Sequence, residues 1–564
     1  MKQVIYQPLK QSDTFSDYPR PQMVRDSYLC LNGEWAFDIS RSERRPEKFA
    51  ETIHVPYPPE SSLSGICKTP ETGEYLHYQR RFSLPDGFKK DRVFLHFGAV
   101  DQIATVILNG ITLGTHEGGY LPFCFEITEL IREENDLYVC VRDDLSLSLP
   151  YGKQTKKRGG MWYTPTSGIW QTVWVESTPK EYISSIKIKQ CADRATIDIC
   201  SDAKEKILIL KETGERFCFD GDSVTVTPKV IRNWTPEDPY LYDFTLIAGE
   251  DSVDGYFALR EIGVQKIGGI PRICLNGKPY FIQALLDQGY YPDGLFLPSS
   301  SEGYKNDILA AKRMGYNTLR KHIKIEPLIF YHLCDKLGMI VFQDMVNNGK
   351  YSFLRDTALP TVGVLKRNDK KLHKDPMARN RFRGAMAETL MHLYNSPSVL
   401  LYTIFNEGWG QFCADEMYRT AKEADGSRIY DSTSGWFWQK ESDVDSLHVY
   451  FKPLKKRPAS ERPLIISEFG GYSLRIDNRL LSPKNYGYKS FSDKDALFCA
   501  LRSLYLEQAL PLVKDGLCGL VYTQIADVED ETNGLLTYDR LTEKVDAQQL
   551  NEVLTLFTKE YEAL

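Results

Sequence analysis

A chain of 564 residues exceeds what one hydrophobic core usually serves, so two or three domains are expected. Apolar residues make up 42% and charged residues 26%, which is typical of globular proteins and excludes the disordered and fibrous classes. The formal net charge of −6 is too mild to indicate nucleic acid or an anionic membrane as a partner. A small or neutral substrate is therefore expected.

The start of the chain, residues 1–8, lacks the apolar core and cleavage site of a secretory leader. No uninterrupted apolar run of about eighteen residues occurs either, so a cytoplasmic location without a membrane partner is expected. The twelve cysteines are scattered singly, without the close C-x-x-C pairs that zinc or dithiol chemistry needs. We predict no metal and no cofactor, and a homo-oligomer stays open.

Residues 1–180 and 181–268 both show the pattern of short β-strands separated by turns. In the first segment, Asn109-Gly110 lies between two strand-like runs and is a strong hairpin signal. No helical period is evident there, which favours a β-sandwich of the jelly-roll type. Runs such as Ala195-Thr-Ile-Asp-Ile-Cys200 in the second segment are typical of immunoglobulin-like strands. The sequence therefore predicts two successive β-sandwich domains.

Residues 269–564 instead alternate buried-strand runs with segments of helical length and period, which predicts a (β/α)8 TIM barrel. Eight candidate strands cover 280–284, 318–320, 339–342, 399–405, 429–431, 446–449, 464–467 and 517–523. The candidate helices cover 302–314, 327–337, 377–395, 413–424, 495–510 and 546–559.

Two glutamates directly follow apolar runs of this predicted barrel. Val399-Leu-Leu-Tyr-Thr-Ile-Phe405 leads into Asn406-Glu407, and Leu464-Ile-Ile-Ser467 leads into Glu468. Barrel active sites form at the C-terminal ends of the strands. Because these are the ends of strands four and seven, both carboxylates are expected to point into one cavity.

A carboxylate pair is what glycoside hydrolysis needs. One carboxyl protonates the leaving oxygen, and the other attacks the anomeric carbon or activates water from the opposite face of the sugar. Burial and a neighbouring anion raise the pKa of the acid, while its partner stays ionised. A core glutamate paired with arginine is the alternative for either residue alone, and two such residues at strand ends make that alternative much weaker.

Five motifs in order resemble those of glycoside hydrolase family 2, which contains β-galactosidases, β-glucuronidases and β-mannosidases. They are Leu31-Asn-Gly-Glu-Trp35, Ser167-Gly-Ile-Trp-Gln171, Leu275-Asn-Gly-Lys-Pro279, Asn406-Glu407 and Ser467-Glu-Phe-Gly470. The resemblance covers nearly the whole chain. It implies a sugar-binding jelly roll, an immunoglobulin-like domain and a catalytic barrel, in agreement with the three patterns above.

The resemblance also implies roles for individual residues. The family retains anomeric configuration, with Glu407 as acid/base and Glu468 as nucleophile. Asn406 matches the residue that binds the sugar 2-hydroxyl, although a strand-end cap is the alternative. Tyr450 matches a tyrosine that hydrogen-bonds the nucleophile, with a core aromatic as the alternative. Arg320 resembles the arginine that braces the nucleophile.

Further candidates come from neighbouring positions. His448 shares the face of Tyr450 if the strand continues, whereas His322 lies one residue earlier than the family's histidine. Asp287 follows strand one, where a turn cap competes with sugar binding. Asp344 ends strand three, where a salt bridge at the barrel rim competes with a hydroxyl contact.

Aromatic and polar groups complete the predicted sugar site. Sugar rings stack on aromatic side chains, and the available tryptophans are Trp162, Trp409, Trp436 and Trp438, with core packing as the alternative for each. Gln524 follows strand eight and is included as a candidate ligand. The acidic run 527–531 lacks the ligand spacing of a calcium loop, and the basic run 366–374 is interpreted as a solvated surface.

We expect a retaining exo-β-glycosidase that acts on terminal non-reducing β-glycosides, with β-galactosides first. The sequence after strand eight lacks the Asn-x-Lys pattern with which β-glucuronidases of the family bind a carboxylate. A β-glucuronidase, a β-mannosidase or an arabinopyranosidase of the same family is the alternative. From another class, a carbohydrate-binding protein without catalysis is the rival, and the two intact glutamates argue against it.

Overall fold

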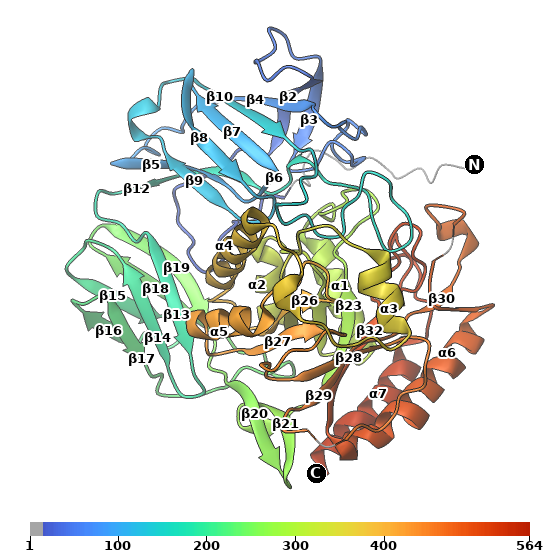
Figure 1. Cartoon of the computed structure of the whole chain (residues 1–564). Helices are drawn as coiled ribbons and strands as arrows, with labels where there is room; N and C mark the ends of the chain where they lie inside the picture. Colours follow the sequence, from blue (N-terminus) through green and yellow to red (C-terminus); the bar gives the residue numbers. More distant parts are fainter. Residues whose placement is uncertain (1–14, 459, 485, 564) are drawn as a thin grey trace.

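The computed structural model describes residues 15–458, 460–484 and 486–563. Two β-sandwiches precede an eight-stranded parallel barrel (Figure 1), so the predicted fold class is confirmed. The exact domain limits at residues 180/181 and 268/269 stay a prediction. The segment inspected for a secretory leader, residues 1–8, lies outside the described residues.

The first sandwich packs a four-stranded sheet against a six-stranded sheet. The four-stranded sheet has the order β1 (Tyr28–Cys30), β12 (Val173–Thr178), β5 (Arg92–Phe97), β9 (Phe123–Glu126). The six-stranded sheet has the order β3 (Glu51–Val55), β2 (Gly33–Ser40), β4 (Tyr75–Phe82), β10 (Asn135–Arg142), β7 (Ile103–Leu108), β8 (Ile111–Glu117). A short pair, β6 (Val100–Asp101) with β11 (Gly168–Ile169), lies beside them.

The hairpin predicted in this sandwich is confirmed. Strands β7 and β8 pair antiparallel around Asn109 and Gly110, which have φ values of 54° and 84°. Two consecutive left-handed residues define the turn whose twist matches that of the flanking strands. Trp35, Phe97 and Val139 belong to the core between the two sheets.

The second sandwich is smaller and follows the alternation of its sequence. In β13 (Ser185–Gln190), exposed and buried side chains alternate strictly, as expected of a strand with one face in the core. Its three-stranded sheet is completed by β14 (Ala195–Cys200) and β17 (Ser223–Val226). The facing sheet has the order β16 (Arg216–Phe219), β15 (Lys206–Leu210), β18 (Tyr242–Ala248), β19 (Asp251–Phe257).

All eight predicted barrel strands are confirmed, each within a few residues. The sheet has the order β27 (Ile429–Ser434), β26 (Val399–Asn406), β25 (Ile340–Asp344), β24 (Thr318–Lys321), β23 (Ile282–Asp287), β32 (Leu517–Thr523), β29 (Leu464–Gly470), β28 (Asp445–Val449). All ladders within it are parallel, and β27 lies against β28 to complete the circle. A three-stranded antiparallel sheet of β20 (Ile262–Ile267), β21 (Ile270–Leu275) and β22 (Lys278–Pro279) precedes it.

Six α-helices of the barrel overlap the predicted segments, and the short α3 (Leu359–Thr361) was not predicted. The helices are α1 (Ser301–Arg313), α2 (Leu328–Leu337), α3, α4 (Pro376–His392), α5 (Ala414–Ala424), α6 (Lys494–Ser503) and α7 (Ala547–Glu562). A short parallel pair, β30 (Tyr472–Leu474) with β31 (Lys489–Phe491), precedes α6. Loops rather than helices follow β27 and β28, and these loops lie at the catalytic end of the barrel.

One helical segment among the described residues, Lys494–Asp515, is long and apolar enough to cross a membrane by length and composition alone. A single segment of this kind is weak evidence, because the core helix of a globular protein passes the same test. It starts with α6, which lies beside α7 on the outside of the barrel (Figure 1), and its Leu497 and Leu501 are buried.

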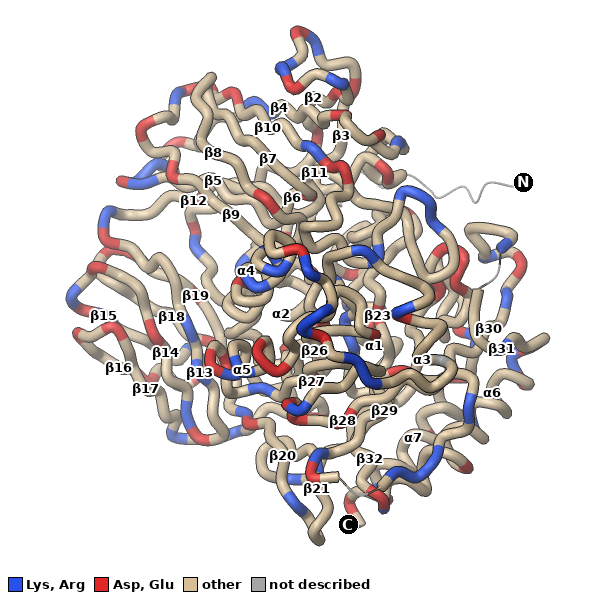
Figure 2. The backbone as a smooth tube through the Cα atoms, viewed as in Figure 1, with Lys and Arg blue, Asp and Glu red and all other residues tan. Residues whose placement is uncertain are grey.

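Acidic and basic residues are interspersed along the chain (Figure 2). This distribution agrees with the mild net charge of −6. Electrostatic attraction to polyanions over a large surface needs a contiguous patch of one sign, so the charge pattern does not point to such a partner.

The second sandwich is attached to the barrel at the C-terminal end of α2. Gly338 caps this helix at φ 71°, and a Cβ built there would lie 2.3 Å from the Pro236 carbonyl oxygen. Nearby, the Trp234 indole donates to the Asp335 carbonyl at 2.7 Å, and the Tyr256 hydroxyl donates to the Asp335 carboxylate at 2.7 Å. The helix end is therefore shaped to fit the sandwich closely.

We expect Gly338→Ala to lower the free energy of unfolding by about 2 kcal/mol or more, because it combines a left-handed backbone with a collision at Pro236. Urea unfolding followed by circular dichroism measures the loss. Gly214→Ala is the matched control, since Gly214 has φ 69° but nothing within 4 Å of its added Cβ. Equal losses in the two variants would contradict a contribution from the contact between the domains.

Candidate active site

The ends of strands β26 and β29 bring the two predicted catalytic glutamates together. Glu407 directly follows β26, and Glu468 lies near the end of β29. One carboxylate oxygen of each and Nδ1 of His448 all lie within 4.8 Å of one another. Such proximity favours a retaining arrangement, in which the carboxyl groups are about 5–5.5 Å apart, over an inverting one of about 6.5–9.5 Å.

Glu407 leaves its strand through a left-handed turn. Its φ is 55°, followed by 72° at Gly408, and its amide donates to the Ser434 carbonyl at 2.9 Å. A non-glycine residue in this region costs on the order of 1–2 kcal/mol, and such costs cluster at functional sites. The side chain of Glu407 remains 15% exposed, which leaves one route from the carboxylate to solvent.

Glu468 is more deeply buried, and donors surround its carboxylate. The Arg320 guanidinium lies 3.2 Å from Oε1, and the Tyr450 hydroxyl donates to Oε2. Burial raises the pKa of Glu468, but the charges of His448 and Arg320, together with the Tyr450 hydrogen bond, lower it to about 2. A carboxylate with this pKa is ionised at neutral pH and is suited to nucleophilic attack.

Arg320 contacts groups from three other strands of the barrel, β25, β26 and β29. Its guanidinium donates to the Asp344 carboxylate at 3.0 Å, the Ser467 carbonyl at 2.8 Å and the Asn406 side-chain oxygen at 2.9 Å, in addition to Glu468. The planar fork of five donors suits this task, which an ammonium group could not perform. Asn406 is thereby oriented beside Glu407.

His448 lies between the two carboxylates with its side chain fully buried. Its Nδ1 is 2.8 Å from Glu407 Oε1 and 3.5 Å from Glu468 Oε2. The neighbouring Gly435, at φ 93°, permits this approach, because a Cβ there would lie 2.9 Å from Nδ1. Trp436 packs edge-on against the imidazole at 5.5 Å.

Two of the other predicted ligands form a buried pair behind Arg320. Asp344 Oδ2 is 2.7 Å from Nδ1 of His322, and both side chains are only 1% exposed. Burial raises the pKa of Asp344, but the charge of Arg320 and the His322 hydrogen bond bring it below its ordinary value. The contacts of Asp344 with Arg320 and His322 therefore favour a salt bridge over a direct contact with a sugar hydroxyl.

Asp287 is engaged away from the two glutamates. Its carboxylate lies 2.6 Å from Lys321 Nζ and accepts the Gly289 amide at 2.8 Å. Successive side chains of a strand point to opposite faces, so Lys321 is directed away from the side on which Arg320 contacts Glu468. These contacts match the turn-cap alternative for Asp287. Among the described residues, no contact of Asp287 with Glu407 or Glu468 supports a sugar-binding role.

A small cavity opens at Glu407. Its lining combines barrel residues with three residues of the first sandwich, and consists of Lys153, Met161, Trp162, Tyr351, Asn406, Glu407 and Trp409. Trp409 packs edge-on against Trp162 at 5.0 Å, and its indole donates to the Gly349 carbonyl at 3.0 Å. These two predicted tryptophans therefore line the same cavity as Glu407.

The end of β32 contributes polar groups to the same region. Gln524 is fully buried, and its amide nitrogen donates to the Asn533 side chain at 2.9 Å, while its Oε1 has no hydrogen-bond partner among the described residues. Glu531 accepts from Tyr163 of the first sandwich and from Asn533. Burial raises the pKa of Glu531, and the charge of Lys153 opposes this rise.

Ser434, Lys153 and Glu531 are among the residues of this region that were not predicted from the sequence. Ser434 ends β27, but the polar run Ser432-Thr-Ser434 gave no apolar signal beyond Asp431. Lys153 belongs to a loop of the first sandwich, far from the barrel in sequence. For Glu531, the acidic run 527–531 was visible, but its contact with another domain was not.

Three carboxylates of the acidic run 527–531, those of Asp527, Glu529 and Glu531, are bound by protein donors. Asp527 lies 2.6 Å from Lys544, and Glu529 accepts the Thr164 amide at 3.0 Å. Among the described residues, the set with metal-ligand spacing is Glu407, His448 and Glu468. The absence of a metal requirement therefore stays a prediction.

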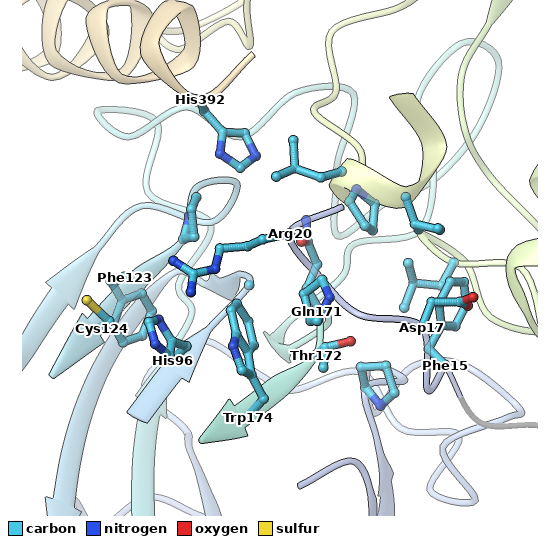
Figure 3. Close-up of a pocket in the computed structure, with 18 residues that line it drawn as sticks. Phe15, Asp17, Arg20, His96, Phe123, Cys124, Gln171, Thr172, Trp174 and His392 are labelled. Carbon is cyan, nitrogen blue, oxygen red and sulfur yellow. The ribbon is translucent and has the colours of Figure 1, made fainter. Parts of the chain in front are cut away.

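A larger cavity of about 230 Å³ lies between the first sandwich and the barrel (Figure 3). Its lining includes Phe15, Arg20, His96, Trp174 and His392, and neither catalytic glutamate is part of it. His96 stacks on Trp174 at 4.8 Å. The volume of a cavity alone is thus a poor guide to the chemistry here.

Two family models match this chain. "Glycosyl hydrolase 2 galactose-binding domain-like" matches residues 71–177, and "Glycosyl hydrolases family 2, TIM barrel domain" matches residues 300–535. Together they cover more than half of the chain, in the order that the fold requires. The chain belongs to glycoside hydrolase family 2.

Curated relatives of this family 2 chain have two names. A β-galactosidase from Thermoanaerobacter pseudethanolicus is 25% identical over 340 residues, which cover 56% of this chain and 44% of the relative. A β-glucuronidase from Bacteroides fragilis is 22% identical over 410 residues, which cover 67% of this chain and 56% of the relative. The chain thus spans about half the length of the curated relatives it matches.

Solved structures match the family 2 chain over nearly its full length. A β-glucuronidase from an uncultured Clostridium sp. has a TM-score of 0.74 at 18% identity, covering 95% of this chain and 99% of that chain. A β-galacturonidase from Eisenbergiella tayi bound to galacturonate has a TM-score of 0.67 at 17% identity, covering 95% and 97%. At these identities the match shows the shared fold.

We expect Arg320→Met to move the acidic limb of the kcat/KM profile to higher pH, because the charge that lowers the pKa of Glu468 is removed. The rate at the optimum should fall about 10²–10³-fold, as when a donor to developing charge is lost. Arg272→Met is the control, since this arginine is also buried and donates to the Val513 carbonyl at 2.7 Å. An unmoved acidic limb in Arg320→Met would contradict the assigned role.

Proposed function

We propose that the protein is a retaining exo-β-glycosidase that releases a terminal non-reducing β-linked sugar. The observation that carries this proposal is the pair Glu407 and Glu468 facing one another across His448. One carboxylate oxygen of each glutamate and one ring nitrogen of His448 lie within 4.8 Å of one another. Membership of family 2 supports the same reaction class. A protein that only binds carbohydrate would have no need for a deeply buried, ionised Glu468 beside a partly exposed Glu407.

The two environments support different roles for the glutamates. In the first step, an oxygen of Glu468 attacks the anomeric carbon as the glycosidic C–O bond breaks, and Glu407 transfers its proton to the leaving oxygen. In the second step, water attacks the glycosyl-enzyme while Glu407 takes a proton from it, and Glu468 is released. The proton count is restored after each turnover.

The cavity at Glu407 supports cleavage at a chain end. Lys153, Met161 and Trp162 of the first sandwich border the cavity on one side and barrel residues border it on the other. A subsite enclosed in this way accommodates a terminal sugar better than an internal one. The side-chain oxygen of Asn406 accepts from Arg320, so its amide nitrogen is the group that we propose as a donor to the 2-hydroxyl of that sugar.

A neutral sugar, with galactose first, is the substrate that we propose. The sequence after β32 lacks the Asn-x-Lys clamp for a carboxylate, and the buried Glu531 would repel a uronate unless it carried a proton. Carboxylate and ammonium groups such as Glu531 and Lys153 can both bind sugar hydroxyls. A uronide is the second candidate, because Lys153 brings a cation to the cavity of Glu407.

We expect Glu468→Ala to abolish turnover on every glycoside, because no glycosyl-enzyme can form. Glu407→Ala should retain far more of the first step with a dinitrophenyl leaving group, which departs without protonation, and the second step should become limiting. Added azide should restore turnover as a β-glycosyl azide in Glu407→Ala and as an α-glycosyl azide in Glu468→Ala. NMR identifies the anomer of each glycosyl azide. If each variant gave the opposite anomer, Glu407 would be the nucleophile and Glu468 the acid/base.

We expect neutral nitrophenyl β-glycosides to exceed β-glucuronides in kcat/KM, with the β-galactoside as the best of the panel. The assay pairs each neutral sugar with its uronide at one pH. A clear preference for a uronide would transfer the sugar assignment to the second candidate, and Lys153→Gln should then reduce that preference. Absence of hydrolysis across the whole panel would favour the carbohydrate-binding rival.

A further inference from the structure

A chain of hydrogen bonds runs from Glu407 into the interior of the barrel wall. His448 contacts Glu407 through Nδ1 at 2.8 Å and Ser434 Oγ through Nε2 at 3.0 Å. The Ser434 hydroxyl donates to Ser467 Oγ at 2.8 Å, and the Ser467 hydroxyl donates to the Leu447 carbonyl at 3.3 Å. All the hydroxyl and ring positions in this chain are buried or partly buried.

The last acceptor sets the direction of the chain. A backbone carbonyl can only accept, so Ser467 donates to Leu447 and Ser434 donates to Ser467. Because the single hydroxyl proton of Ser434 is then used, its oxygen accepts from His448, which therefore carries a proton on Nε2. This tautomer is assigned from the hydrogen-bond network.

The contact between His448 and Glu407 then contains a second proton. With Nε2 protonated, Nδ1 either accepts the O–H of a protonated Glu407 or donates as an imidazolium to an ionised Glu407. A separation of 2.8 Å between two acceptors without a proton would be repulsive. Both arrangements have the same number of protons, so the pair holds one proton jointly.

We infer that the proton which Glu407 delivers to the leaving group is held jointly with His448, which acts as a positioning residue for the acid/base. The inference rests on the proposed function. As the glycosidic bond breaks, the shared proton passes from the pair to the leaving oxygen through Glu407. When water attacks the glycosyl-enzyme, the proton of that water returns to the pair.

The charges around His448 favour retention of this proton. Glu468 Oε2 lies 3.5 Å from Nδ1, so loss of the proton would leave two carboxylate anions facing one another around a neutral ring. Other charged and titratable neighbours among the described residues include Arg320 and Tyr450, which both bind Glu468, and the buried Asp431. His322 interacts electrostatically with Glu468, and Tyr351, Tyr486 and Tyr488 interact in the same way with Glu407. Burial raises the pKa of Asp431 to about 6, a rise that the charge of His448 opposes.

The decisive variant is His448→Asn, for which wild-type and variant protein are compared on a methyl glycoside and a 2,4-dinitrophenyl glycoside of the preferred sugar. For the methyl glycoside, kcat/KM should fall on the order of 10²-fold, the lower end for loss of acid catalysis. The alkaline limb should move about one pH unit or more to lower pH, because the proton leaves earlier. For the dinitrophenyl glycoside, the change should stay within several-fold.

Three controls separate this role from a structural one. Tyr450→Phe removes a donor to Glu468, so both substrates should lose rate alike and the alkaline limb should stay in place. Asp431→Asn removes a buried carboxyl whose charge interacts with that of His448 but leaves the hydrogen-bond chain intact, so the limb should move less than in His448→Asn. Ser467→Ala breaks the chain behind His448 and should move the limb in the direction seen for His448→Asn, by a smaller amount.

Equal losses on the two substrates with an unmoved alkaline limb in His448→Asn would overturn the inference. If that variant does not fold, the alkaline limb of the kcat/KM profile of Ser467→Ala is the test. A shift of this limb to lower pH supports a proton shared by Glu407 and His448, and an unmoved limb overturns the inference. Failure of the proposed function has a different signature, because wild-type protein would then hydrolyse neither glycoside.

Discussion

The buried guanidinium of Arg320 is the constraint on which the catalytic end of the barrel depends. It compensates two buried carboxylates, Asp344 and Glu468, and fixes Asn406 and the Ser467 carbonyl. A buried charge without partners costs several kcal/mol, so these groups are stable only as a set. The ionised state of Glu468 and the orientation of Asn406 therefore share one physical cause.

The register of the barrel strands makes this set possible. Asn406 pairs with Ser434 in β26 and β27, and His448 pairs with Glu468 in β28 and β29. Irregular pairing after Leu447 and after Ile466 adjusts the register just before the catalytic level. Side chains from four strands are thereby brought to the same level along the barrel axis, at the C-terminal ends of the strands, where the active sites of such barrels form.

The sequence was sufficient where one local pattern determined the structure. Barrel strands were predictable because runs such as residues 399–405 are mostly apolar, and the glutamates were predictable because polar residues follow those runs. Asp287 shows the limit of this reasoning, since the position of Lys321 on the neighbouring strand determines which way its carboxylate is bound. Lys153 could not be found, because its role depends on how two domains pack.

The unequal surroundings of the two glutamates follow from which side chains reach each of them. Arg320 on β24, which is not a sheet neighbour of β29, brings a permanent positive charge to Glu468, whereas Glu407 meets the neutral end of β27 and the imidazole of His448. A permanent cation can only stabilise an anion, while an imidazole can also give and take a proton. In the proposed mechanism, Glu468 as nucleophile is thus held in one protonation state, and Glu407 as acid/base has a partner with which it can alternate between two.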